Sequence, residues 1–74
     1  MAASRQIVSF QIAADPPQRL DKALSRDVPD AASLSRSRLA RMIPLGEVTV
    51  NGAVVTDPRA KVAEGDTIEV SVEL

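Results

Sequence analysis

The chain has 74 residues with no cysteine and no histidine, which excludes disulfides, a thiol nucleophile and a zinc site built from the usual ligands. Its length suits one small domain that depends on packed aliphatic side chains for its stability. The net charge of −1 and the isoelectric point near 5.2 argue against a generic nucleic-acid binder.

No segment approaches the roughly 18 uninterrupted apolar residues of a membrane span, and residues 1–10 lack the long apolar run of a secretory signal. We therefore expect a soluble, cytoplasmic protein without a membrane partner. The ten carboxylates have no histidine or cysteine beside them that would mark an activated site. No catalytic residue, cofactor or metal is expected, and the chain by itself is predicted not to be an enzyme.

Charge is divided unevenly along the chain. Residues 19–41 hold six cations against three aspartates, whereas residues 42–74 hold two cations against six carboxylates. A polyanion responds to the local potential rather than to the total charge. The isoelectric point therefore does not exclude nucleic acid as a partner.

Residues 6–12 are predicted to form a half-buried strand, because apolar and polar residues alternate there. The apolar side consists of Val8, Phe10 and Ile12. Phe10 is the only aromatic residue of the chain, and this pattern turns it toward the core. Base-stacking modules need exposed aromatic side chains, so a nucleic acid would be bound through phosphate, shape and hydroxyl contacts, which suits structured RNA.

After a break at residues 15–17, a first helix is predicted over residues 19–26. Its apolar face consists of Leu20, Ala23 and Leu24. The opposite side carries a basic stripe of Arg19, Lys22 and Arg26, which is either a binding surface or an ordinary solvated helix face. Asp21 lies in the first turn, where a carboxylate complements the helix dipole.

A second helix is predicted to begin after Ser35, a good N-cap residue, and to end at Pro44. Its apolar face consists of Leu39, Met42 and Ile43. Arg36 and Arg38 place two cations in the first turn, where the dipole favours anions by roughly 0.3–1 kcal/mol each. An anion held between the helix start and these guanidinium groups would compensate both charges; the alternative is a solvated surface of good helix formers.

A tight hairpin is predicted around Asn51-Gly52, the dipeptide that best suits a two-residue type I′ turn. The residues facing each other across it are Val48 and Val50 on one side and Ala53 and Val55 on the other. Gly46 reverses the chain before the hairpin, and further turns are expected at Asp57-Pro58 and at residues 64–66. Residues 67–74 alternate strictly, which predicts a strand with its inward side formed by Ile68, Val70, Val72 and Leu74.

Four blocks of the sequence, in the same order, resemble the S4 RNA-binding domain. They are Arg19-Leu20-Asp21-Lys22-x-Leu24, Leu34-Ser35-Arg36-Ser37-Arg38-Leu39, Gly46-x-Val48-x-Val50-Asn51-Gly52 and Lys61-Val62-x-x-Gly65-Asp66-x-Ile68. The resemblance covers residues 19 to about 72. The leader strand and the second block are most similar to the large-subunit class of RNA pseudouridine synthases, in which the S4 domain precedes a larger catalytic domain.

The resemblance implies an α+β fold of two short helices packed on a small, twisted, mostly antiparallel sheet. Residues 1–18 would be a leader strand and turn, and residues 19–74 an S4-like domain excised from a longer protein. Its helical face would bind structured RNA, here ribosomal RNA, and position a catalytic domain that follows Leu74 in the parent pseudouridine synthase. We expect a monomer. With the basic stripe of the first helix included, the expected RNA-binding residues are Arg19, Lys22, Arg26, Ser35, Arg36, Ser37, Arg38, Arg41 and Lys61.

Two other functions are kept as alternatives. The first is a free-standing, ribosome-associated S4 protein that binds ribosomal RNA. The second is a protein-interaction module without nucleic acid, in which the acidic hairpin and the C-terminal strand would add to the sheet of a partner. Binding that persists at high salt and ignores changes to the arginines would favour the second alternative.

Overall fold

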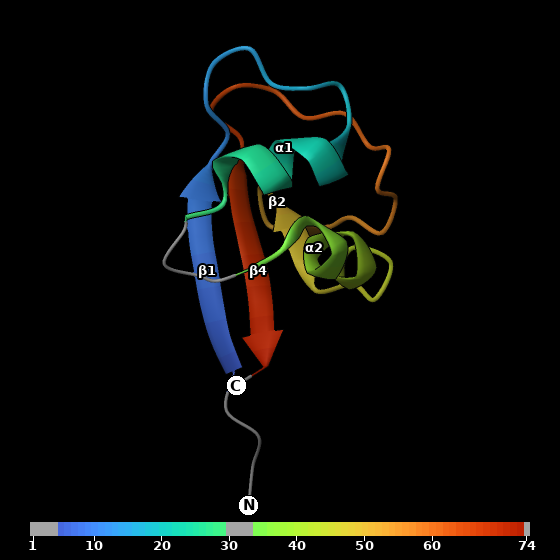
Figure 1. Cartoon of the computed structure of the whole chain (residues 1–74). Helices are drawn as coiled ribbons and strands as arrows, with labels where there is room; N and C mark the ends of the chain where they lie inside the picture. The colour runs from blue at the N-terminus through green and yellow to red at the C-terminus, as the bar shows by residue number, and fades with distance from the viewer. Residues whose placement is uncertain (1–4, 30–33, 74) are drawn as a thin grey trace, which may run out of the picture.

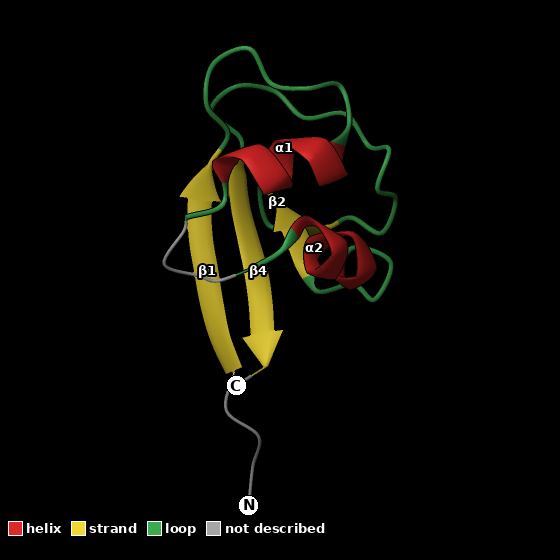
Figure 2. Cartoon of the chain, viewed as in Figure 1, coloured by secondary structure: helices red, strands yellow, loops and turns green. Residues whose placement is uncertain are grey.

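The computed structural model describes residues 5–29 and 34–73, which form two helices and a four-stranded sheet (Figures 1 and 2). In chain order the elements are β1 (Arg5–Gln11), α1 (Leu20–Asp27), α2 (Arg36–Met42), β2 (Val48–Val50), β3 (Ala53–Val54) and β4 (Thr67–Glu73). This arrangement confirms the predicted α+β class. Among these residues, no helix combines the length and the apolar character needed to cross a bilayer.

β4 is the central strand of the sheet. The strand order is β1-β4-β2-β3, and every pairing in the described sheet is antiparallel. β1 pairs with β4 over its whole length, and β2 pairs with residues 68–70 on the other side of β4. The C-terminal strand is therefore not at an edge of the sheet, contrary to what the protein-interaction alternative required. An added strand would have to pair with β1 or with the two-residue β3.

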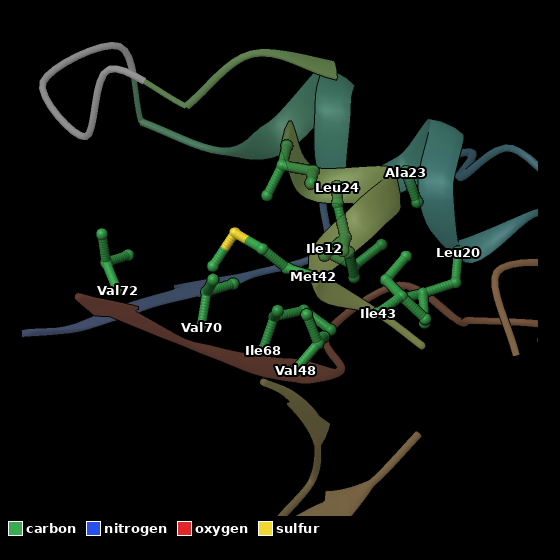
Figure 3. Close-up of a cluster of buried hydrophobic side chains, with 11 residues drawn as sticks. Ile12, Leu20, Ala23, Leu24, Met42, Ile43, Val48, Ile68, Val70 and Val72 are labelled. Carbon is green, nitrogen blue, oxygen red and sulfur yellow. The ribbon is translucent and has the colours of Figure 1, made fainter. Parts of the chain in front are cut away.

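The hydrophobic core lies between the two helices and one face of the sheet (Figure 3). Its buried side chains are Ile12, Leu20, Ala23, Leu24, Leu39, Met42, Ile43, Val48, Ile68, Val70 and Val72. The apolar faces predicted for both helices are confirmed, and so is the inward side of β4 except for Leu74, which lies outside the described residues. Phe10 is only partly buried and packs at the margin of the core.

Both ends of α2 follow from local sequence. Ser35 Oγ accepts a hydrogen bond from the backbone N–H of Arg38 at 3.1 Å, which confirms the predicted N-cap. The helix ends before Pro44, and Gly46 then adopts a φ of +79°, in the left-handed region that glycine enters without strain. This reversal leads directly into β2, so α2 and the hairpin are held close together.

The hairpin turn is fixed by Asn51 and Gly52, whose φ angles of +52° and +84° are those that a type I′ turn requires. The Asn51 side chain also joins the turn to the start of β4. Its Oδ1 accepts from the Thr67 N–H at 2.9 Å, and its Nδ2 donates to Asp66 Oδ1 at 3.1 Å. The hairpin and β4 are therefore linked by side-chain as well as backbone hydrogen bonds.

The pKa of Asp66 is lowered because its carboxylate accepts hydrogen bonds from the Ala63 N–H and from the Asn51 side chain. Such a carboxylate stabilises the fold above its unfolded pKa of about 3.9, and this contribution is lost as the pH falls through that value toward the folded pKa. We therefore expect the urea midpoint to fall as the pH is lowered through about 3.9, and Asp66→Asn to lower the midpoint at neutral pH and to reduce this fall. Glu64→Gln neutralises an exposed carboxylate in the same turn and should change neither the midpoint at neutral pH nor its fall in acid. Equal effects of the two substitutions would contradict this role of Asp66.

Candidate nucleic-acid interface

α2 presents three arginines to solvent. Its buried residues, Leu39 and Met42, face the sheet, and Arg36, Arg38 and Arg41 are exposed. We call these three residues the α2 arginines. Within the described part of the chain, none of their guanidinium groups forms a salt bridge or a hydrogen bond. Ser37 is exposed beside them.

The start of α2 is already partly satisfied by its own cap. Because Ser35 Oγ accepts from the Arg38 N–H, that donor is not left for an external anion. The three guanidinium groups are the charged groups that this helix offers to an anion. Guanidinium groups are well suited to this role, since each can donate two parallel hydrogen bonds to one phosphate.

The basic stripe of α1 is organised differently, beginning with Arg19. Arg19 Nη2 lies 2.9 Å from Asp21 Oδ2, and Arg19 Nε donates to Asp21 Oδ1 at 3.2 Å. Asp21 Oδ1 also accepts from the Lys22 N–H at 2.8 Å, so this carboxylate anchors the first helical turn, as its position in the sequence predicted. The charge of Arg19 is thus locally compensated, although its side chain is 44% exposed. Lys22 is exposed and has no carboxylate partner in the described chain.

Arg26, the last residue of the predicted stripe, holds the loop after β1. Its guanidinium donates to both carboxylate oxygens of Asp27, at 2.8 and 3.0 Å, and to the carbonyls of Asp15 at 2.7 Å and Ala13 at 3.3 Å. Asp27 in turn accepts from the Ala13 N–H at 3.0 Å, and the pKa of Asp27 is lowered, first of all by the hydrogen bond from Arg26. All these contacts lie within the chain, so the Arg26 side chain connects the end of α1 to the loop after β1.

The remaining predicted residue, Lys61, follows a turn that packs on the start of α1. The Leu20 N–H donates to the Ala60 carbonyl at 2.8 Å, and the Asp21 N–H donates to the Pro58 carbonyl at 3.1 Å. These bonds bring residues 57–61 beside the first turn of α1, although about forty positions separate the two segments in the sequence. Residues 5–29 and 34–73 contain no pocket and no group of three or more acidic, histidine or cysteine side chains able to hold a metal ion.

The turn at residues 57–60 also carries an exposed cation that was not among the predicted RNA-binding residues. This cation is Arg59. It lies between Pro58 and Ala60, whose carbonyls accept hydrogen bonds from the first N–H groups of α1. The predicted turn at Asp57-Pro58 was the only local signal. Nothing in the sequence pattern indicated that this turn would contact the first helix.

Part of the sequence matches a known protein family. The S4 domain family matches residues 32–68, which is half of the chain. The chain belongs to the S4 domain family.

The curated relatives that it resembles are longer proteins that share one name. Over 57 residues, or 77% of this chain, it is 53% identical to ribosomal large subunit pseudouridine synthase D of Pasteurella multocida. Over the same length it is 49% and 46% identical to the proteins of that name from Vibrio vulnificus and Vibrio cholerae. The matched segment is 17% of the length of each relative, so the chain corresponds to a small part of these proteins.

The different roles of Arg26 and Arg41 predict different effects on stability. Arg26→Ala removes the donors that hold residues 13–15 and leaves Asp27 without its cationic partner, so we expect the urea midpoint to fall. Arg41→Ala, the matched control on α2, removes an exposed side chain with no described partner and should not lower the midpoint. A similar loss of stability in both variants would contradict the structural role assigned to Arg26.

Proposed function

We propose that this chain is the RNA-binding domain of a ribosomal RNA pseudouridine synthase. It holds structured RNA through phosphate contacts and thereby positions a separate catalytic domain, which isomerises uridine to pseudouridine. The observation that carries the proposal is the exposed set of α2 arginines without carboxylate partners in the described chain. The similarity to proteins named ribosomal large subunit pseudouridine synthase D supports the choice of RNA and of the reaction.

Electrostatics favour a polyanionic partner for α2. Arg38 and Arg41 are three residues apart on one helix, and like charges at this spacing destabilise a helix by roughly 0.2–0.5 kcal/mol. Arg36 and Arg38 lie in the first turn, where the helix dipole also disfavours cations. A phosphate backbone relieves both effects, because it supplies several negative charges at once and releases its own counterions on binding.

The hydrogen-bonding groups on α2 favour structured RNA over single strands. The only aromatic residue, Phe10, lies in β1 and is partly buried against the core, so it offers no stacking platform. Double-stranded RNA is recognised mainly by contacts to phosphates and 2′-hydroxyl groups. The guanidinium groups suit the phosphates, and the exposed hydroxyl of Ser37 suits either group.

The reaction itself belongs to a domain outside this chain. Asp21, the carboxylate of the Arg-Leu-Asp block, is bonded to Arg19 and to the Lys22 N–H, which fits a role in the helix start rather than that of a nucleophile. The matched segment covers 17% of each relative, and the rest of a parent protein of that length can contain the catalytic domain. In this proposal the domain is a monomer and works in the cytoplasm.

Reversing one α2 charge tests the proposal. In Arg38→Glu and Arg41→Glu we expect binding to a labelled ribosomal RNA hairpin, followed by fluorescence anisotropy, to weaken roughly tenfold or more, because hydrogen bonds to charged groups contribute about 1.5–3 kcal/mol. The slope of log K against log salt should also fall by roughly 0.9 for each duplex phosphate that the variant no longer neutralises. Arg5→Glu is the matched control, since Arg5 lies on β1 and contacts Ser71. Unchanged affinity in both α2 variants would refute the assignment of this surface.

A further inference from the structure

The turn at residues 57–60 is closed by hydrogen bonds. Asp57 and Pro58 occupy the first two positions of a β-turn, where both residue types are favoured. The Ala60 N–H donates to the Asp57 carbonyl at 3.0 Å, and the Arg59 N–H donates to Asp57 Oδ1 at 2.9 Å. Arg59 is therefore carried by a turn that is closed by both backbone and side-chain hydrogen bonds.

This turn is also attached to α1. The carbonyls of Pro58 and Ala60 accept from the Asp21 and Leu20 N–H groups, at 3.1 and 2.8 Å. Figure 1 shows the segment, in orange, passing the teal start of α1. Pro58 and Ala60 are partly buried, whereas Arg59 between them is exposed. Contact with α1 thus fixes the residues on either side of Arg59 and leaves its side chain to solvent.

The charges gathered at this junction are mostly positive. Four cations and two carboxylates lie on the joined segments; Asp21 is paired with Arg19, whereas Asp57 accepts from the neutral Arg59 N–H and keeps its charge. The three remaining cations, for which the described residues provide no ion pair, are Lys22, Arg59 and Lys61. This basic group is unexpected, because residues 42–74 as a whole carry an excess of carboxylates.

We infer that Arg59, with Lys22 and Lys61, forms a second phosphate-binding point for the RNA that the α2 arginines hold. The inference rests on the proposed function and extends it to a second surface, at the junction of α1 with the turn at residues 57–60. The helix start itself takes no part, because its first N–H groups are occupied by the Pro58 and Ala60 carbonyls. A cation on a preformed turn binds with little loss of conformational entropy.

Two-point binding restricts the partner. A short single strand can adjust to one basic surface, but an RNA that contacts both α2 and the α1 junction has to present phosphates at a fixed separation. A folded RNA does so without a further ordering cost. The second point therefore selects for RNA shape, which is what a chain without stacking aromatic residues can recognise.

Arg59→Glu tests this inference directly. The substitution keeps the backbone N–H that bonds to Asp57, so the turn is retained, and an unchanged urea midpoint verifies the fold. With the same ribosomal RNA hairpin, we expect weaker binding and a salt slope reduced by roughly 0.7–0.9, the effect of leaving one phosphate without its cation. Combined with Arg38→Glu, the losses of binding free energy should add, because the two residues lie on different segments and share no hydrogen-bond partner in the described chain. Arg5→Glu, with the same change of charge on β1, should bind like the unmodified chain.

The outcomes separate this inference from the proposed function. If Arg59→Glu binds like Arg5→Glu while Arg38→Glu binds weakly, the second point is refuted and the proposed function stands. If the unmodified chain does not bind the hairpin even at low salt, the proposed function fails and the second point fails with it. Weakened binding in both Arg38→Glu and Arg59→Glu supports the two-point interface.

Discussion

Burial of aliphatic side chains against one face of β4 is the interaction on which the rest of this structure depends. β4 is paired on both sides, and its residues Ile68 and Val70 are fully buried beneath the two helices. A chain of this size without disulfides has few other sources of stability. Because each helix has to turn its apolar side toward the sheet, its opposite side is left to polar residues. The exposed position of the α2 arginines is a direct consequence of how the core is packed.

Ion pairing then decides which of the cations remain available. The two arginines at the ends of α1 are bonded to Asp21 and Asp27, and Arg26 in addition holds the loop after β1. The α2 arginines have no such partners in the described chain. A protein with a net charge of −1 can therefore present a strongly basic surface, because its carboxylates neutralise cations on other elements. Net charge affects solubility and the long-range attraction of charged partners, but it does not reveal a local binding surface.

Local chemistry made much of the fold predictable from the sequence. The Ser35 cap, the stop at Pro44 and the turn at Asn51-Gly52 each depend on a few adjacent residues, and the structure confirms them. The strand order and the roles of the α1 arginines depend on contacts between segments far apart in the chain. Arg26 bonds to the backbone of residues 13–15, which lie beside the end of α1. Arg59 lies beside the start of α1 because its turn, about forty positions later in the sequence, accepts hydrogen bonds from that helix. Periodicity cannot reveal such contacts, so the sequence alone could not show that Arg19 and Arg26 have partners within the chain.

Backbone amide shifts during titration with a structured ribosomal RNA fragment test the central claim most directly. The claim is that the outward side of α2 is the primary contact surface, and the measurement follows all backbone positions at once. We expect the amides of residues 35–41 to shift at low salt, those of β1 to stay in place, and the shifts to fade as salt rises, because the contacts are to phosphates. Shifts confined to β1 and β3, or shifts that persist at high salt, would show that the chain binds through its sheet edges instead.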